Sequence, residues 1–368
     1  MIYFLGRYLY SHFEKFSFLR LADYISARAI GAALTAIILT LYLTPKIIRY
    51  LHSRGMVDQQ RSTGTASAFE KAGTPAMGGA IVMGCVLFSC LLWCNLTNLF
   101  LIVVLLGMCW FGMIGFMDDL AKTRGRSGDS GISERKKLVL QAVFAAALTA
   151  LMICQWSPLP ASQIGDLYIP FVKVPIFQSL WIYIPVIFFF IIVVGNSVNI
   201  ADGMDGLAIV PSVFVIGVLG LFGYFIGNYN YANYLFYPFL PGAGELAVFA
   251  SAFAGAGIGF LWFNAYPAQI FMGDTGSMSI GGAAAAMCVV LQQEALFLIL
   301  GGMFLAEAVT SQIQDKIGIK WIGRRIFLRA PMHHRMQHNG LAETKVVIRL
   351  WIVSGILALA ALATLKLR

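Results

Sequence analysis

Two amides and two carboxylates follow one another at intervals of three residues in the stretch 195–207, which reads GNSVNIADGMDGL. These four residues are Asn196, Asn199, Asp202 and Asp205. On a helix this spacing predicts that all four side chains stack along one face. A face of oxygens and amides at the end of an apolar run suits a cation, a phosphate or a nucleoside. Helix capping around Gly203 and Gly206 is the alternative, but it explains one or two of these residues and not four in register.

Two adjacent carboxylates, Asp118 and Asp119, end another apolar run in the stretch IGFMDDLAK. Neighbouring carboxylates at a membrane boundary repel each other and lose hydration, so they favour a nearby cation. Lys122 follows one helical turn later. A weakly stabilising surface pair of Asp and Lys is the alternative reading of this segment.

A third acidic candidate, Asp274, lies in the stretch 263–277, FNAYPAQIFMGDTGS. The glycines and hydroxyls around it predict a tight turn that leaves backbone N–H groups free near a helix start, which suits a phosphate or a metal-bound carboxylate. Asn264 and Phe271 add an amide and a stacking ring. Alone, the turn could be a simple N-cap. With the other carboxylates it predicts a Mg²⁺ ligand, because Mg²⁺ takes one or two protein carboxylates and fills its other positions with phosphate and water.

Three weaker candidates complete the set. Lys71 precedes a glycine-rich helix start in KAGTPAMGG, where it could hold an anionic group or belong to an ordinary turn. His333 and His334 cannot share one helical face and have no Cys nearby, so they predict contacts to a phosphate or sugar rather than a zinc site. Ordinary surface residues are the alternative for the histidines. Gln314 is a further amide near the end of an apolar run.

The composition shows what must position these residues. The chain is 59% hydrophobic and only 12% charged, against about 25% charged in soluble domains. Repeated apolar stretches of about 18 to 22 residues indicate a polytopic membrane protein. In a bilayer this means an all-α helical bundle, because each segment must satisfy its own backbone groups. Ten transmembrane helices are expected at about 24–45, 77–94, 98–117, 138–155, 176–194, 206–226, 245–263, 277–291, 295–312 and 346–366.

Three further features refine this picture of one transmembrane domain over residues 1–368. Residues 1–23 mix charged and aromatic side chains, which is more typical of an interfacial helix than of a signal peptide. The eighth span is short and rich in Gly and Ala, so we expect it to pack closely or to break. The six cysteines lie in or beside apolar runs without metal-ligand spacing and are expected to be core or lipid-facing residues.

The basic residues predict the orientation. Nineteen of the 26 Lys and Arg residues lie in or just beyond the segments 46–76, 118–137 and 313–345, whereas the alternate loops contain only Lys173. The positive-inside rule therefore places the basic segments in the cytoplasm and both termini outside. The net charge of +9 is read as this topology signal and as an attraction for anionic substrates, and not as a nucleic-acid surface.

This topology puts every candidate cluster on one side of the membrane. The expected cytoplasmic segments are 46–76, 118–137, 195–205, 264–276 and 313–345, and they contain all the acidic, amide and histidine candidates. Such an arrangement predicts an enzyme that joins a water-soluble, nucleotide-linked anion to a lipid-borne acceptor, with Mg²⁺ between them. A cation-coupled transporter is a rival, but transporters place coupling groups near the bilayer midplane.

The motifs closely resemble those of the phospho-N-acetylmuramoyl-pentapeptide transferases, within the polyprenyl-phosphate N-acetylhexosamine-1-phosphate transferases. The matching stretches are KAGTPAMGG (71–79), GFMDD (115–119), GNSVNIADGMDGL (195–207), FNAYPAQIFMGDTGS (263–277) and APMHH (330–334). The resemblance implies ten transmembrane helices, a homodimer and a place in the bacterial cytoplasmic membrane with the active site on the cytoplasmic face. It also implies transfer of phospho-MurNAc-pentapeptide from UDP-MurNAc-pentapeptide to undecaprenyl phosphate, giving lipid I and UMP in peptidoglycan synthesis.

The resemblance also implies roles for individual residues. Asp118, Asp119 and Asp274 would be the acidic catalytic set, with Asp274 binding Mg²⁺, and Lys122 and Lys137 would face the phosphates. His333 and His334 match the family's histidine motif. The residues that would contact uridine or sugar are Lys71, Asn199, Asp202, Gly203, Met204, Asp205, Asn264, Phe271 and Gln314.

Two departures from the family pattern limit what can be carried over. Arg335, Met336 and Gln337 stand where the family usually has a third histidine, an aromatic residue and a Glu, and Ala76 stands where Thr is common. The nearest rival activity is transfer of GlcNAc-1-phosphate to the same lipid. The residues leave two mechanisms open: direct attack by the lipid phosphate, or a two-step route through a covalent phospho-sugar on an Asp.

Overall fold

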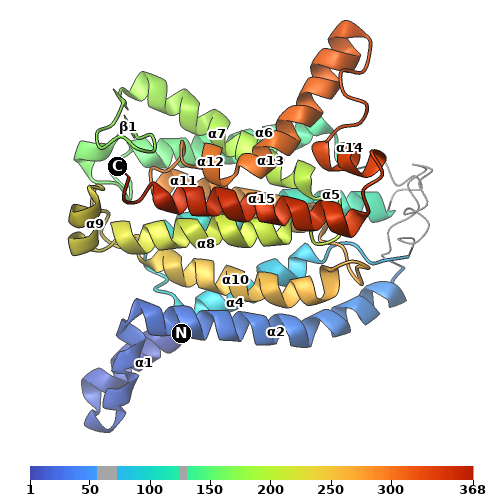
Figure 1. The fold of residues 1–368 in the computed structure, drawn as a ribbon. Helices are drawn as coiled ribbons and strands as arrows, with labels where there is room; N and C mark the ends of the chain where they lie inside the picture. Colours follow the sequence, from blue (N-terminus) through green and yellow to red (C-terminus); the bar gives the residue numbers. More distant parts are fainter. Residues whose placement is uncertain (56–72, 125–130, 368) are drawn as a thin grey trace.

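The computed structural model describes residues 1–55, 73–124 and 131–367. The fold is 73% helical, and its described strands are two short antiparallel pieces, β1 (Asp166–Leu167) and β2 (Phe177–Gln178), with Asp166 opposite Gln178. This confirms the all-α fold that the composition predicts. Figure 1 shows long helices lying side by side with their axes roughly aligned.

Seven of the described helices are long and apolar enough to cross a membrane, so the chain is a multi-pass membrane protein. They are α2 (Ile25–Ser53), α5 (Leu99–Arg124), α6 (Glu134–Ile153), α7 (Leu180–Ala201), α8 (Ile209–Ile226), α10 (Glu245–Asn264) and α15 (Glu343–Ala363). The other three expected spans correspond to α4 (Gly79–Trp93), α11 (Gly273–Val290) and the pair α12 (Phe297–Leu300) and α13 (Gly302–Gln312). The shorter helices are α1 (Ile2–His12), η1 (Glu14–Asp23), η2 (Ala161–Gln163), α9 (Tyr229–Leu235), η3 (Ile313–Ile322) and α14 (Met332–His338).

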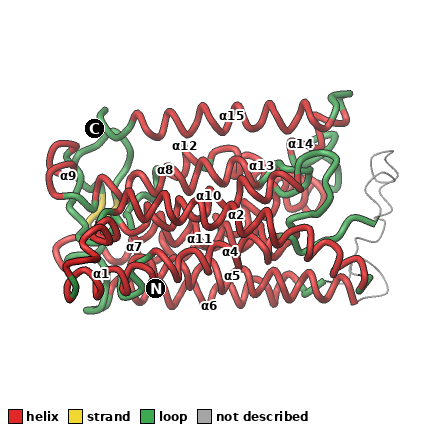
Figure 2. The backbone as a smooth tube through the Cα atoms, turned by 90° about the horizontal axis from the view of Figure 1, so that it is seen from below, coloured by secondary structure: helices red, strands yellow, loops and turns green. Residues whose placement is uncertain are grey.

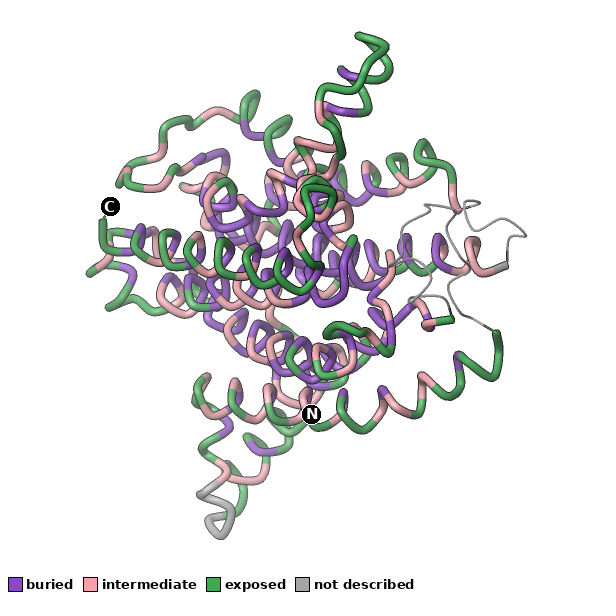
Figure 3. The backbone as a smooth tube through the Cα atoms, turned by 45° about the vertical axis from the view of Figure 1, so that its right-hand side comes forward, coloured by how far each residue is buried: buried purple, intermediate pink, exposed green. Residues whose placement is uncertain are grey.

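Helix α11 forms the centre of the bundle. Every residue from Thr275 to Val290 is buried, and the helix packs against α4, α5, α7 and α8. Small side chains permit this close packing: a Cβ added to Gly79 of α4 would overlap the Cα of Gly276. The expectation of a closely packed eighth span is therefore correct, and the helix does not break. Figure 3 shows the buried residues concentrated in the middle of the molecule.

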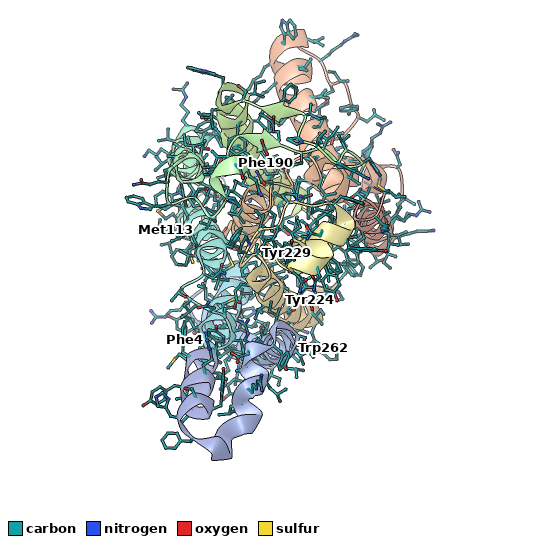
Figure 4. All side chains as sticks on the ribbon, turned by 90° about the vertical axis from the view of Figure 1, so that its left-hand side faces the viewer. Phe4, Met113, Phe190, Tyr224, Tyr229 and Trp262 are labelled. Atoms are coloured by element: carbon teal, nitrogen blue, oxygen red, sulfur yellow. The ribbon has the colours of Figure 1, made fainter. Side chains whose placement is uncertain are left out.

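The outer surface of the bundle is apolar, as lipid contact requires. Figure 4 looks along the helix axes and shows Met113 and Trp262 on opposite flanks, where they are 46% and 76% exposed. The helices that carry them, α5 and α10, bury their other faces against α11 and α2. Large exposed apolar side chains on a soluble protein would favour aggregation, but in a bilayer they face acyl chains.

The ninth expected span, 295–312, differs from the prediction of one continuous helix. The chain forms α12, turns at Gly301 and resumes as α13, which continues directly into the π-helical η3. The ring of Phe297 occupies the space where a Cβ on Gly301 would lie. In Figure 1 the continuous α13–η3 segment rises away from the bundle, and the chain then returns to α14.

Alternation of the long helices gives the molecule two distinct ends. At one end, which we call the site end, lie the C-terminal ends of α2, α5, α7, α10 and α13, together with α14. At the other end, which we call the far end, lie α1, α9 and the β1–β2 pair (Figure 1). Both chain termini lie toward the far end in Figures 1 and 2. The described parts of all five polar segments lie toward the site end, which is the one-sided arrangement expected from the sequence.

A buried ion pair ties helices together at the far end. The Arg28 guanidinium of α2 donates a hydrogen bond to the Glu245 carboxylate of α10, and both side chains are at least 94% buried. The same carboxylate oxygen accepts a bond from the backbone N–H of Asn95 at 2.6 Å, and Arg28 lies over the ring of Tyr3 at 4.7 Å. These contacts join α1, α2, α10 and the segment after α4.

Candidate active site

Two carboxylates and two lysines from three helices meet at the site end. Asp118 Oδ2 lies 2.7 Å from both Lys122 Nζ and Lys137 Nζ. Asp274 Oδ2 lies 2.9 Å from Lys122 Nζ and 3.1 Å from Lys137 Nζ. Asp118 and Lys122 come from α5, Lys137 from α6 and Asp274 from α11. Each lysine thus bridges two carboxylates that are 156 positions apart in the sequence.

Asp119 serves a different purpose from its neighbour Asp118. Its Oδ1 accepts a hydrogen bond from the Asp274 backbone N–H at 3.0 Å, and its Oδ2 accepts bonds from the backbone N–H and the hydroxyl of Thr275 at 2.8 and 2.6 Å. Asp119 therefore fixes the first turn of α11. Gly115 lets the backbones come this close, since a Cβ there would overlap the Asp274 carbonyl.

The structure corrects the prediction that Asn196, Asn199, Asp202 and Asp205 share one helical face. Helix α7 ends at Ala201, so only the two amides lie on it, and they have different partners. Asn199 donates from Nδ2 to Asp274 Oδ1 and to Ser277 Oγ, both at 3.0 Å. Asn196 instead pairs reciprocally with Gln141 of α6. Asn199 therefore belongs to the acidic cluster, whereas Asn196 joins two helices beside it.

The turn after α7 brings further carboxylates toward the cluster. Loss of hydration raises the pKa of Asp202 to about 8. Repulsion from the carboxylates of Asp274, Asp119 and Asp205 contributes to the same upward shift. Asp205 is buried, and its Oδ2 accepts a hydrogen bond from the Ala268 backbone N–H at 3.1 Å. Asp202 is therefore largely protonated at neutral pH, while Asp205 connects the two loops.

Asn264 and the segment around Phe271 hold these loops in place. Asn264 accepts a bond from the Gly206 N–H at 3.1 Å through Oδ1 and donates to the Ile270 carbonyl at 2.9 Å through Nδ2. The Phe271 backbone N–H donates to the Pro75 carbonyl at 2.9 Å, so the stretch before α4 lies alongside this loop. Met204 is buried, and Gly203 is exposed. Lys71 lies outside the described residues.

The remaining predicted residues come from the C-terminal third of the chain. His333 is buried and lies directly against Gly203, since a Cβ on that glycine would overlap His333 Nε2. His334 is exposed. Gln314 accepts hydrogen bonds from the backbone N–H groups of Ile326 and Phe327 at 3.1 and 2.9 Å, so its side-chain oxygen closes the loop after η3.

The departures from the family pattern fall on the same segment. Arg335 is exposed, with its guanidinium 6.0 Å from the centre of the Phe327 ring, and Met336 packs against the hydrophobic core. Both positions lie on α14, two and three residues after the buried His333. Arg335 thus lies on the exposed side of α14, and Met336 lies on the side that packs on the core. His333 remains buried at the site end.

Several residues of the site were missed in the sequence. Thr275 and Ser277 bind Asp119 and Asn199, and they stand inside a stretch that was singled out only for its turn. Glu307 binds His333, and Glu343 accepts a hydrogen bond from the Asp205 N–H at 3.2 Å. A signal was available for Glu307, because a carboxylate within an apolar span is a functional candidate by default.

The donor set fits a magnesium ion in charge and chemistry. Within the described residues, no group of three or more His, Cys, Asp or Glu side chains forms a metal-binding cluster. Mg²⁺ needs only one or two protein carboxylates, however, when phosphate and water complete its coordination. The three carboxylates of Asp118, Asp119 and Asp274 outnumber the two lysines at this site. Among them Asp274 is bonded from three helices, α5, α6 and α7, which makes it the central candidate ligand.

The fold and site together define a class of protein: a multi-pass membrane enzyme whose buried carboxylates and lysines meet at one end of a helical bundle. The sequence model of glycosyl transferase family 4 matches residues 101–292, just over half of the chain, and the protein belongs to this family. The matched region runs from α5 through α11 and contains the carboxylate–lysine cluster. The family contains the polyprenyl-phosphate hexosamine-1-phosphate transferases, and it implies a polyprenyl phosphate acceptor and a nucleotide-sugar donor.

Proposed function

We propose that the protein transfers phospho-MurNAc-pentapeptide from UDP-MurNAc-pentapeptide to undecaprenyl phosphate, producing lipid I and UMP. Family membership supports a polyprenyl-phosphate sugar-1-phosphate transferase. The choice of the muramoyl donor rests on the resemblance of the APMHH stretch and of the residues around Asp274. The location would be the bacterial cytoplasmic membrane, with the site end at the cytoplasmic face and a homodimer as the assembled form.

The observation that carries this proposal is the sharing of Lys122 and Lys137 between Asp118 and Asp274. Two ammonium groups held side by side by carboxylates form a preorganised cationic pair, and such pairs stabilise the charge that develops on transferring phosphoryl groups. The lysines are 28% and 21% exposed, so a phosphate can reach them. The site thus suits a reaction in which two phosphate groups must approach each other despite repulsion.

In the direct route, an oxygen of the lipid phosphate attacks the β-phosphorus of the donor. The new P–O bond forms as the bond between the β-phosphorus and the bridging oxygen breaks, and UMP leaves with that bond's electron pair. Lys122 and Lys137 bind the phosphate oxygens, and Asp118 orients the lysines and the incoming lipid phosphate. Asp119 acts as a positioning residue, because both of its oxygens are bound to the first turn of α11.

A Mg²⁺ ion on Asp274 would neutralise charge on the pyrophosphate and on the leaving UMP. Asn199 orients Asp274 from the other side, through a hydrogen bond to Oδ1. In a two-step route, an Asp carboxylate oxygen attacks the β-phosphorus and UMP leaves; the lipid phosphate then attacks the same phosphorus and releases the carboxylate. Asp118 and Asp119 are both bound by neighbouring groups, Asp118 by the Ile132 N–H and the two lysines and Asp119 by the first turn of α11, so either carboxylate must leave its partners before it attacks.

Release of UMP by the purified protein tests the proposal. The protein, reconstituted with undecaprenyl phosphate and Mg²⁺, should release UMP from UDP-MurNAc-pentapeptide and form a lipid-linked product, and EDTA should stop the reaction. Omitting the lipid phosphate controls for donor hydrolysis. Turnover of UDP-GlcNAc alone would transfer the assignment to the GlcNAc-1-phosphate activity. If neither donor gave UMP while reconstituted vesicles showed cation flux, the protein would be a transporter instead.

A further inference from the structure

Glu307 and His333 form a buried pair outside the carboxylate–lysine cluster. Glu307 lies on α13 and His333 on α14, and their side chains are 0% and 1% exposed. The Glu307 Oε2 lies 3.1 Å from His333 Nδ1. The same carboxylate accepts the His333 backbone N–H, at 3.2 Å through Oε1 and 3.3 Å through Oε2. One carboxylate therefore holds both the backbone and the ring of this histidine.

This contact fixes where the other ring nitrogen points. A carboxylate at Nδ1 requires a proton there, which leaves Nε2 on the opposite side of the ring. Nε2 is buried, has no hydrogen-bond partner within the described part of the chain, and faces Gly203. Gly203 itself is exposed and adjoins Asp202, so the nitrogen lies at the edge of the turn after α7.

A buried polar nitrogen without a partner is costly, and native sites retain such groups where a ligand meets them. Gly203 packs directly against Nε2, where the Cβ of any other residue would overlap the ring, and this exposed glycine is the point at which a ligand can approach the nitrogen. The adjoining turn also carries Asp202 and Asp205, two of the residues proposed to contact the nucleotide sugar. A ligand atom that meets Nε2 would therefore belong to the donor and not to the lipid chain.

We propose that Glu307 is a positioning residue that aims His333 Nε2 at the nucleotide-sugar donor beside the exposed Gly203. This inference rests on the proposed transferase function and extends it to a residue on the broken ninth span. Because the contact is made to the bound donor before and during transfer, its loss weakens binding without removing the chemistry. Such an interaction appears in the KM for the donor more than in kcat.

The first variant is Glu307→Gln, which keeps the size and an acceptor oxygen but removes the charge. Loss of a hydrogen bond to a charged group predicts a rise of about 10-fold in the donor KM, with kcat changed less than about 3-fold. Asp315→Asn removes a carboxylate from an exposed position on η3 and is the matched control, with no change expected.

The second variant tests whether Glu307 acts through the histidine. In His333→Asn the amide nitrogen replaces Nδ1 and can still donate to Glu307, but nothing replaces Nε2. It should raise the donor KM at least as much as Glu307→Gln. Adding Glu307→Gln to His333→Asn should then have little further effect, because the two residues act as one unit. The KM for the lipid phosphate should stay unchanged throughout.

The outcomes separate this inference from the proposed function. If the unaltered protein releases no UMP from UDP-MurNAc-pentapeptide or UDP-GlcNAc, the transferase assignment fails first. If it turns over a donor but Glu307→Gln lowers only the melting temperature and leaves the donor KM unchanged, Glu307 is a structural link and the inference is overturned. Fully additive KM effects in the double variant would also overturn it.

Discussion

Buried charged side chains are compensated in different ways at the two ends of the bundle. At the far end, Arg28 and Glu245 form one cation–anion pair that also binds a backbone N–H and an aromatic ring. At the site end, the two lysines pair with Asp118 and Asp274, and the neighbouring Asp119 adds a third carboxylate whose partners are neutral donors of α11. A matched pair connects helices and needs nothing else. An unmatched cluster is costly to maintain in the apo protein and suits a site that binds cations and phosphates.

This comparison predicts that a charge change at the site end affects activity far more than stability. Asp274→Asn should lower the rate of UMP release by about 10³-fold or more, because Asp274 orients both lysines and is the candidate metal ligand. The melting temperature should change by only a few degrees, since the amide fills the same space. UMP release and thermal melting in detergent, measured on the same preparation, check both parts.

Asp315→Asn, at an exposed position, is the control for loss of a carboxylate. A rate within a factor of a few of the unaltered protein would remove Asp274 from the mechanism. It would also contradict the proposed difference between the two ends, because the carboxylate–lysine cluster would then not be needed for activity.

A charge change at the far end should show the opposite pattern. Arg28→Ala leaves Glu245 buried without its cation, which typically costs about 3–5 kcal/mol of folding free energy. The folded fraction should retain its kcat and KM, because the pair lies at the other end of the helices from the cluster. Thermal melting and specific activity per folded molecule measure the two effects.

Arg7→Ala provides a matched control at the same end. The Arg7–Asp23 pair is exposed, with side chains 56% and 37% accessible, so its loss should lower the melting temperature far less than the loss of Arg28. Equal losses for Arg7→Ala and Arg28→Ala would mean that burial of the Arg28–Glu245 pair does not matter, contrary to the comparison.

A smaller effect is expected where a carboxylate of the site is held by a neutral hydroxyl. Thr275→Val keeps the shape of the side chain but removes the hydroxyl that donates to Asp119. Hydrogen bonds to charged groups contribute about 1.5–3 kcal/mol, so both the melting temperature and the rate should fall, the rate by about 10-fold. Ser279→Ala is the control, because among the described residues its hydroxyl bonds only to the Gly276 carbonyl within α11. Full activity of Thr275→Val would show that Asp119 does not need this bond to position Asp274.

The sequence predicted the architecture better than the contacts within it. Apolar runs identified ten helical segments because lipid contact requires a long apolar surface, and basic residues placed the polar segments at one end. The break at Gly301 was not foreseen, since a single glycine in an apolar run does not by itself end a helix. The central helix α11 was recognised from its small residues, although its composition is too polar for a lipid-facing span.

Individual site contacts were harder to foresee, because they depend on where helices end and how they rotate. The interval of three between Asn196 and Asn199 suggested a common face, but α6 and α11 contact different sides of α7, so the two amides separate. The link between Glu307 and His333 crosses from one helix to another after a loop. Short-range spacing contains no information about such a pairing.

A second buried carboxylate at the far end, Glu294, differs from Glu245 because no cation pairs with it among the described residues. Glu294 lies between α11 and α12, is 4% exposed, and has no hydrogen-bond partner for either carboxylate oxygen among the described residues. Burial raises its pKa from the usual 4.5 to about 8. The far end therefore neutralises this group with a proton, whereas lysines neutralise Asp118 and Asp274 at the site end.

The sign of the resulting pH dependence follows from the raised pKa. Below about pH 4.5 both folded and unfolded Glu294 are protonated, and the group does not affect stability. Between pH 4.5 and 8 the unfolded carboxyl loses its proton while the folded one keeps it, so folding becomes less favourable as pH rises. Glu294→Gln should thus melt close to the unaltered protein at pH 5 and several degrees above it at pH 8. Glu134→Gln, at an exposed position of α6, is the control and should show no such divergence. A constant difference in melting temperature between Glu294→Gln and the unaltered protein from pH 5 to pH 8 would mean that Glu294 does not carry a proton in the fold.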